Sequence, residues 1–204
     1  MKGNFITLEG IEGSGKSTSL NTITEILKER HIDFIITKEP GGGPLGKDLR
    51  SMLLSKSSQI SPEVELLLMM ADRKNHIDNL VMPNINNGVW VISDRYLHST
   101  YAYQGGGRQI NTSKIDSLVR LLDLPQPNLT LLFDLSPSIA LDRAKKRSEL
   151  DRFESEPMDF HERIRDAYVS LYEDNPERFR MIDSSADFIE VKRQVEKIVL
   201  DFIG

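Results

Sequence analysis

The chain lacks cysteine altogether and carries a single tryptophan among its 204 residues. Without cysteine it can form neither a disulfide nor a thiolate metal site, which favours a reducing compartment, and we expect a cytoplasmic location. It also has no run of about 18 apolar residues, so we expect no membrane-spanning helix. Its first residues, "MKGNFITLEG", lack the charged and then apolar pattern of a secretion signal.

An excess of basic charge is absent too. The net charge of −5 at pH 7 argues against nucleic acid or an anionic membrane as a general partner. The four histidines, His31, His76, His98 and His161, show no metal-ligand spacing, and we assign them no catalytic role. The hydrophobic fraction of 39% and charged fraction of 28% are typical of a soluble globular protein, and the length fits one domain over residues 1–204.

Short apolar runs alternate with longer helical patterns along the chain. Such runs are typical of parallel strands covered on both faces, so we predict an α/β fold with a doubly wound, five-stranded parallel sheet. The predicted strands are Phe5–Glu9, Phe34–Lys38, Val89–Asp94, Leu129–Leu135 and Phe179–Asp183. The predicted helices are Ser17–Arg30, Leu45–Leu54, Pro62–Asn86, Thr112–Leu122, Ser138–Arg147, Met158–Asp174 and Ala186–Phe202.

Three segments look irregular: Lys38–Gly46, Tyr103–Ile110 and Arg147–Pro157. The first two follow predicted strands closely. In an open α/β sheet, ligands bind beyond the carboxyl ends of the strands, so we expect these two segments to border a binding site.

The segment "GIEGSGKS" matches the phosphate-loop pattern G-x-x-x-x-G-K-[ST] between a predicted strand and a predicted helix. Its glycines let successive N–H groups point inward around an anion, and the helix that follows adds its positive end. An ordinary glycine-rich turn is the alternative. The motif predicts nucleotide binding without choosing between a kinase, an ATPase and a GTP switch. The expected ATP-contacting residues are Gly10, Ile11, Glu12, Gly13, Ser14, Gly15, Lys16, Ser17 and Thr18.

Other features narrow this choice. Asp94 ends the strand in "VISDRY", where a carboxylate would lie near a metal ion, although a strand-end aspartate is also common as a simple cap. No N-K-x-D guanine signature is present, which weakens the GTP-switch interpretation. Five cations surround an irregular segment in "RAKKRSELDR", which is either a solvated helix face or a mobile lid carrying arginines over the phosphates.

The chain resembles the thymidylate kinase family, in its bacterial type with lid arginines, from end to end. The resemblance rests on "LEGIEGSGKST", "KEPGGGPLGKDLR", "DRYLHSTYAYQGGGR", "PNLTLLFDL" and "LDRFESEPMDFHERIRDAY", which occur in the family's order and approximate spacing. The segment "DRYLHSTYAYQGGGR" is the most specific of these. The resemblance implies the fold of P-loop nucleoside-monophosphate kinases and in-line transfer of a phosphoryl group from ATP to dTMP with Mg²⁺, for dTTP biosynthesis.

The resemblance also implies roles for individual residues around the two phosphates. Lys16 would contact the ATP phosphates, and Ser17 and Asp94 would hold Mg²⁺, directly or through water. Arg50 and Arg95 would bind the dTMP phosphate, assisted by Lys38, while the Glu12 carboxylate would lie near the sugar 3′-hydroxyl or the metal. The implied catalytic residues are Lys16, Asp94, Arg95 and Arg152.

At the base, the resemblance assigns Arg73 to the thymine carbonyl and Tyr103 to the sugar. A departure from the family occurs at Met69, which stands where an aromatic residue usually stacks on thymine; Met70 or Leu68 is the alternative at this position. A methionine sulfur contributes about 0.3–1.5 kcal/mol against a ring, compared with about 1–3 kcal/mol for an aromatic stack. The implied dTMP-binding residues are Glu12, Lys38, Arg50, Met69, Arg73, Arg95, Ser99, Thr100, Tyr103 and Gln104.

The expected lid covers residues 147–157. The resemblance places Arg147 against adenine and directs Arg152 at the transferred phosphoryl group. One branch of the family carries an arginine in the phosphate loop where this chain has Gly13, so the lid must supply that charge. The apolar helix around "VELLLMMADR" is expected to pack on the sheet or in a homodimer interface. The alternatives are a kinase for another monophosphate, such as dUMP or dCMP, or for a deoxynucleoside, and more remotely a regulatory ATPase.

Overall fold

The sheet predicted from the sequence is present. The computed structural model describes residues 2–147 and 149–204, the side chain of residue 147 excepted. Every pair of neighbouring strands is parallel, in the order β2-β3-β1-β4-β5. The predicted bounds of β1, β2 and β5 are confirmed, and β3 and β4 each differ from the prediction by one residue at one end. The strands are β1 (Phe5–Glu9), β2 (Phe34–Lys38), β3 (Trp90–Asp94), β4 (Leu129–Asp134) and β5 (Phe179–Asp183).

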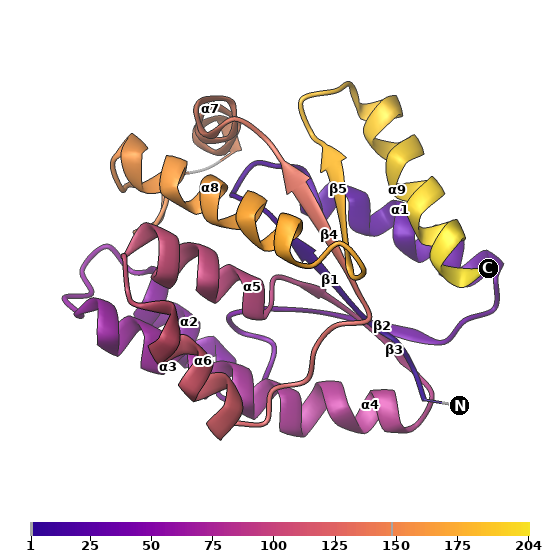
Figure 1. Cartoon of the computed structure of the whole chain (residues 1–204), viewed down its shortest axis with the longest axis horizontal. Helices are drawn as coiled ribbons and strands as arrows, with labels where there is room; N and C mark the ends of the chain where they lie inside the picture. The colour runs from indigo at the N-terminus through magenta and orange to yellow at the C-terminus, as the bar shows by residue number, and fades with distance from the viewer. Residues whose placement is uncertain (1, 148) are drawn as a thin grey trace.

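Helices cover both faces of this sheet, which gives the doubly wound architecture (Figure 1). Two π-helical segments, η1 (Ile77–Val81) and η2 (Tyr101–Gly107), continue helices α3 and α5. The predicted helix Pro62–Asn86 is therefore one continuous stretch made of α3, η1 and α4. The α-helices are α1 (Lys16–Glu29), α2 (Gly46–Leu54), α3 (Pro62–His76), α4 (Met82–Asn86), α5 (Leu97–Thr100), α6 (Thr112–Leu121), α7 (Pro137–Arg147), α8 (Met158–Asp174) and α9 (Phe188–Ile203).

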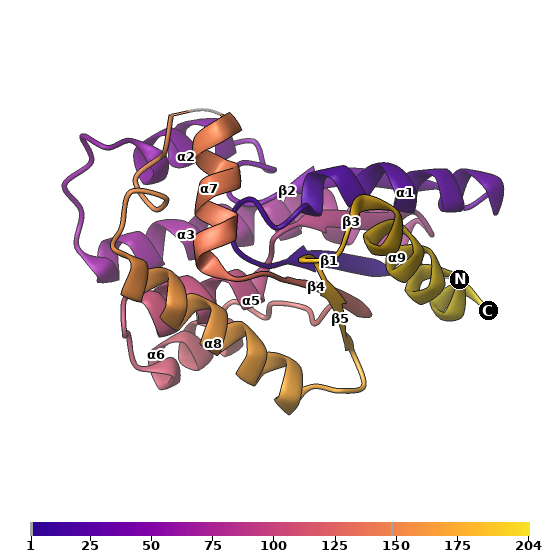
Figure 2. The ribbon, with the colours of Figure 1, turned by 90° about the horizontal axis from the view of Figure 1, so that it is seen from above.

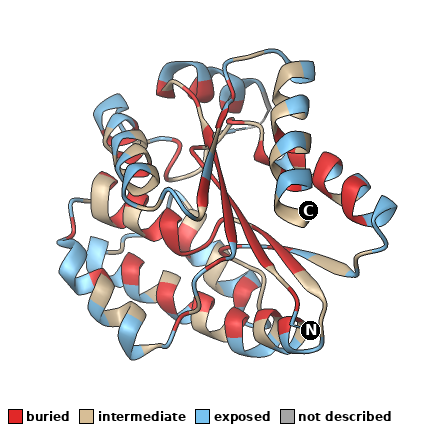
Figure 3. Ribbon diagram, turned by 45° about the vertical axis from the view of Figure 1, so that its right-hand side comes forward, coloured by how far each residue is buried: buried red, intermediate tan, exposed pale blue. Residues whose placement is uncertain are grey.

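The inner strands β3, β1 and β4 are buried along most of their length, as their nearly continuous apolar runs predict, whereas the edge strands β2 and β5 each leave residues exposed. Along β1, Phe5 packs with residues of α3, η1 and α6, while Ile6 and Leu8 pack with α1 and α9. Figure 3 shows the strands as the most completely buried part of the molecule. Among residues 2–147 and 149–204, no helix combines the length and the apolar character needed to cross a membrane.

The prediction of an irregular segment at Tyr103–Ile110 is wrong. Helical structure continues through α5 and η2 to Gly107, although glycine has a low helix propensity. The glycines allow η2 to pack closely on α8: a Cβ added at Gly106 would lie 2.7 Å from the Cβ of Ala167, and one at Gly107 would lie 2.6 Å from the Phe160 ring. Tertiary packing therefore overrides local propensity here. The other two segments, Lys38–Gly46 and the described part of 147–157, lie mainly outside regular elements, as predicted.

The carboxyl ends of the strands lie at the end of the molecule away from both chain termini. Figure 2 shows α2, α7 and the segment that follows α7 gathered at that end, with the two termini at the other. The loops after β1, β2 and β3 open there, as expected for the ligand-binding edge of an open α/β sheet.

Candidate functional site

A cavity of about 320 Å³ opens at this edge, within the size range of small-ligand sites. Most of the binding residues predicted from the sequence line it, although they come from separate elements. The predicted residues on its wall are Glu12, Ser17, Lys38, Arg50, Met69, Arg73, Asp94, Arg95, Ser99, Thr100, Tyr103 and Gln104. The remaining wall residues were not predicted individually, although all but Leu54 lie in the segments 38–46 and 147–157 expected at the site: Glu39, Pro40, Leu54, Asp151 and Phe153.

The phosphate loop, residues 10–17, joins β1 to α1 through backbone conformations that favour glycine. Gly10, Gly13 and Gly15 have φ angles of 134°, 76° and 93°. A Cβ added at Gly13 would lie 2.3 Å from the carbonyl oxygen of Ala140 in α7. Because α7 packs directly on the loop, an arginine at position 13 is sterically excluded.

Lys16 is buried beneath this loop. Its Nζ donates to the carbonyl oxygens of Gly10 at 3.0 Å and Ile11 at 2.8 Å. Burial, with the nearby Arg95 cation, lowers the pKa of Lys16 to about 8. The ammonium group therefore contacts the loop's own carbonyl groups and is not part of the cavity wall. Among the other predicted loop residues, Ser14 is buried and Thr18 is exposed in the first turn of α1.

Arg95 connects the phosphate loop to the far side of the cavity. It follows β3 with a φ of 73°, in the left-handed region that non-glycine residues seldom occupy outside functional sites. Its guanidinium donates to the Gly10 carbonyl at 2.9 Å, to the Glu12 carboxylate at 2.7 Å and to the Tyr103 hydroxyl at 3.0 Å. This geometry fixes a cation between the loop and the predicted sugar-binding side.

A buried carboxylate that the sequence analysis missed supports this arrangement. Glu9, the last residue of β1, accepts hydrogen bonds from Ser99 Oγ at 2.6 Å, Tyr168 OH at 3.0 Å and the backbone N–H of Tyr96 at 2.9 Å. Burial raises the pKa of Glu9 above its usual range. Its position at the end of an apolar strand, directly before the loop, was the available sequence signal.

The oxygen atoms of Ser17 and Asp94 face the same cavity, and their chemistry fits Mg²⁺. The Oδ1 atom of Asp94 is buried and, within the described residues, has no hydrogen-bond partner. Mg²⁺ prefers oxygen ligands and usually binds through one or two protein groups together with water and substrate phosphates. The described part of the chain contains no cluster of three or more His, Cys, Asp or Glu side chains arranged around a metal position.

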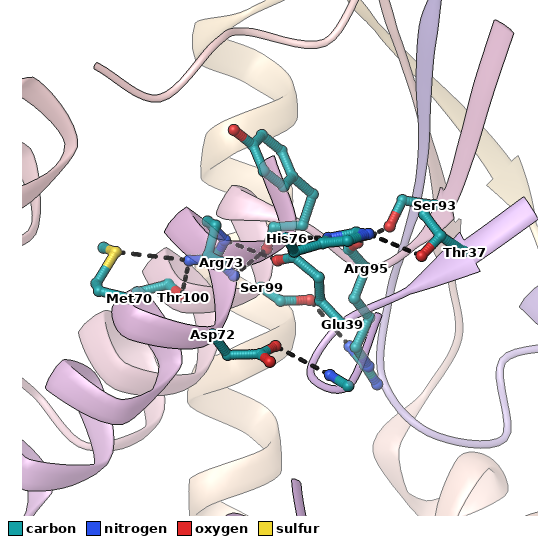
Figure 4. A network of polar contacts seen from close by, with 12 residues as sticks. Thr37, Glu39, Met70, Asp72, Arg73, His76, Ser93, Arg95, Ser99 and Thr100 are labelled. Atoms are coloured by element: carbon teal, nitrogen blue, oxygen red, sulfur yellow. Dashed lines mark hydrogen bonds and ion pairs between the residues drawn. The ribbon is translucent and has the colours of Figure 1, made fainter. Parts of the chain in front are cut away.

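Arg73, another residue on the cavity wall, is held by a network of polar contacts (Figure 4). Its Nε donates to Glu39 at 2.7 Å, and its other nitrogen atoms donate to Thr100 Oγ1 at 2.7 Å and to the carbonyl oxygen of Tyr96 at 2.9 Å. The side chain is 2% exposed, so these bonds replace its contacts with water.

The carboxylate of Glu39 is fixed in turn by His76, whose Nδ1 lies 2.8 Å from Glu39 Oε1. The Nε2 atom of His76 lies 2.7 Å from Thr37 Oγ1, and Figure 4 shows this chain running from the sheet to Arg73. His76 therefore has a positioning role that its isolated place in the sequence did not suggest.

Methionine at the predicted base position does face the cavity. Met69 lies on its wall, whereas Met70 is buried and its sulfur accepts from Arg73 at 3.7 Å. Leu68, the other alternative, is not among the residues on the wall. The geometry favours Met69 as the residue that contacts a base.

Arg152 lies away from the phosphate loop in this structure. Its guanidinium pairs with Glu65 at 2.8 Å, donates to the Leu53 carbonyl at 2.8 Å and covers the Phe153 ring at 4.5 Å. Arg152 is not on the cavity wall, although its neighbours Asp151 and Phe153 are. Arg147 ends α7, and the adenine contact expected from its side chain lies outside the described residues.

Comparison with known proteins gives one consistent result. A family model described as thymidylate kinase matches residues 8–195. A thymidylate kinase of Carboxydothermus hydrogenoformans is 46% identical over 90% of this chain and 90% of its own length. That of Nitrosomonas europaea is 42% identical over 98% and 94%, respectively. The crystal structure of thymidylate kinase from Ehrlichia chaffeensis superposes with a TM-score of 0.80 at 31% identity, covering 98% of this chain and 99% of the other.

Proposed function

The chain belongs to the thymidylate kinase family and phosphorylates dTMP, and from this we propose that ATP with Mg²⁺ is the donor and that transfer is in line within the cavity described above. One observation carries the proposal. Ser17 of the phosphate loop and the base-side residues Arg73 and Gln104 lie on the wall of one cavity. A nucleoside triphosphate held by the loop and a monophosphate held at the other end would thus bring their phosphates together.

Arg95 is where the two phosphates would meet. The acceptor phosphate is already ionised, so no general base is needed, and catalysis rests on positioning and charge. Arg95 and Arg50 would bind the dTMP phosphate, with the exposed Lys38 at the rim. Lys16 would exchange its contacts with the loop carbonyls for the ATP phosphates, which are stronger partners for an ammonium group.

The remaining assignments concern the nucleoside and the metal. Tyr103 and Glu12 lie where the sugar would be, and Met69, Thr100 and Gln104 join Arg73 around the base, with Ser99 beside them. Ser17 and Asp94 would hold Mg²⁺ directly or through water. When bound, this ion neutralises charge on the phosphates during transfer.

The segment 147–157 is proposed to be a lid. Gly13 leaves no space for a side chain, so the phosphate loop cannot add an arginine at this position to the charge of Lys16. In the proposed closed state Arg152 leaves Glu65 and provides a cation over the transferred group, and Arg147 packs on adenine. An arginine in this position contributes on the order of 10³–10⁵ in rate.

The proposed assembly is a homodimer in the cytoplasm, formed by a single domain that spans residues 1–204. Support for the dimer comes from α3, where Val64 and Leu67 are 42% and 55% exposed although both are apolar. Sedimentation at micromolar concentration tests it, and a monomer would contradict it.

A coupled assay of ADP release tests the reaction. With ATP and Mg²⁺, turnover should require dTMP, and dUMP and dCMP assayed side by side show how strictly the base is chosen. Lys16→Ala should abolish transfer, because the loop then lacks its cation. ATP turnover that is independent of any monophosphate, or near-normal transfer by Lys16→Ala, would contradict the proposal.

A further inference from the structure

Glu65, in α3, is a buried acidic residue that none of the assignments above uses. It is 1% exposed and is surrounded by hydrogen-bond donors. Its carboxylate accepts hydrogen bonds from Gln104 Nε2 at 2.8 Å and from Arg108 Nε at 3.2 Å, and it forms an ion pair with Arg152 at 2.8 Å. An ionised carboxylate can only accept hydrogen bonds, so every neighbouring group must present a proton to it.

The contact with Gln104 determines which end of its amide faces the ligand. Since the NH₂ group is bound to Glu65, the amide oxygen is the end left for the cavity, whose wall Gln104 forms. Within the described part of the chain, no hydrogen bond is made to that oxygen. A ligand with an N–H donor at this point would complete its hydrogen bonding.

We propose that Glu65 is a positioning residue that selects the base by fixing the amide orientation of Gln104. This inference rests on the proposed placement of the base beside Gln104. Ring nitrogen N3 carries a proton in thymine and uracil, whereas in cytosine it is an acceptor. With the amide oxygen turned to the cavity, Gln104 accepts the hydrogen bond from thymine N3–H. A base whose N3 is an acceptor, such as cytosine, would instead be repelled by this oxygen.

Rotating the amide to suit an acceptor base is unfavourable here. The rotation would bring the Gln104 oxygen against the Glu65 carboxylate, leaving two buried acceptors with no proton between them. Glu65 is also held by Arg108, which does not belong to the proposed lid, so it cannot easily move aside. Gln104 itself is 1% exposed in η2, which packs on α8, so its side chain cannot swing out of the protein into bulk solvent.

The test uses Glu65→Gln, which keeps the shape but gives position 65 both a donor and an acceptor. Dissociation constants are measured for dTMP and for the 5′-monophosphate of a pyrimidin-2-one deoxyriboside. In this analogue N3 is an acceptor, and no 4-amino group is present to oppose Arg73. The preference for dTMP should fall at least tenfold in Glu65→Gln, because either amide orientation is then satisfied. A smaller change in the ratio overturns the proposal, including equal weakening of both ligands, which is the result of a purely structural role.

Two further variants distinguish a failure of this inference from a failure of the proposed placement of the base. Glu156→Gln is the matched control, since Glu156 also pairs with Arg108 but does not contact Gln104; it should leave the ratio unchanged. Gln104→Leu should abolish the discrimination at N3. If Gln104→Leu leaves the ratio unchanged, the base does not lie beside Gln104, and both the site assignment and the inference fail. If it lowers the ratio while Glu65→Gln does not, the inference alone fails.

Loss of charge balance around Arg108 is the main risk to folding of Glu65→Gln. Should that variant fail to fold, the double variant Glu65→Gln/Arg108→Met also removes one of the two cations that pair with Glu65. The same tenfold fall in the ratio is expected of it, and a smaller fall overturns the proposal.

Discussion

Replacing Arg73 by methionine should lower the stability of the ligand-free protein substantially. It should also weaken binding of the base. The substitution removes a cation that is 2% exposed and leaves the Glu39 carboxylate, 4% exposed, with His76 as its remaining side-chain partner. Removing one member of a buried ion pair typically costs about 3–5 kcal/mol, because the other charge stays desolvated. The hydrogen bonds to Thr100 and to the Tyr96 carbonyl are lost with it.

Thermal melting of the ligand-free protein, followed by circular dichroism, measures this cost. For a domain of this size each kcal/mol shifts Tm by about 2–4 °C, so a fall of about 6–20 °C is expected. Arg50→Met is the matched control, because Arg50 lies on the same cavity wall but, within the described residues, makes a single hydrogen bond, to the Pro40 carbonyl, and is only partly buried. Its expected cost is about 1 kcal/mol. If Arg73→Met melts within about 3 °C of the wild type, the polar chain contributes little to stability and the reasoning fails.

Three other changes test the proposed site. Met69→Phe should tighten dTMP binding about fivefold, from a gain of about 1 kcal/mol in stacking, and an unchanged dissociation constant would show that residue 69 does not face the base. Lys16, with a pKa of about 8 in the free enzyme, is charged below that pH and loses its proton above it, so ATP affinity should fall as pH rises beyond 8. Calorimetry in buffers of different ionisation heat should then show uptake of about one proton on ATP binding near pH 9 and almost none near pH 7; equal uptake at both would contradict the assignment. Arg152→Ala should lower kcat by on the order of 10³ or more with little change in dTMP affinity, and a loss confined to KM would indicate a binding role only.

The sheet could be predicted because each strand carries its own signal. The runs at β1, β3 and β4 are almost continuously apolar, a pattern typical of strands covered by helices on both faces, and these three strands are the buried ones. The sequence signal of the phosphate loop is also local, since its glycines and its lysine all lie within residues 10–17. Helix η2 was missed for the opposite reason, because the demand for Gly106 and Gly107 comes from α8, more than fifty residues away in the sequence.

The buried carboxylates of the site could not be predicted. Glu65 lies in an amphipathic helix and Glu39 in a loop, where acidic residues are usually solvated. Each is buried because another element of the fold brings a guanidinium or amide group against it. The spacing of residues in the sequence does not reveal such a contact. The left-handed backbone of Arg95 is not marked in the sequence either, because arginine has no preference for that region.

The pairing of several arginines with carboxylates has a kinetic consequence. On the cavity wall Arg73 pairs with Glu39 and Arg95 with Glu12, and nearby Arg108 and Arg152 share Glu65, so much of the positive charge around the cavity is matched before any ligand arrives. With a net charge of −5 on the whole chain, the long-range field draws an incoming nucleotide only weakly. The association rate of dTMP should accordingly change little with ionic strength. Recognition of the anion begins when the nucleotide reaches the rim and competes at short range for cations that already have partners.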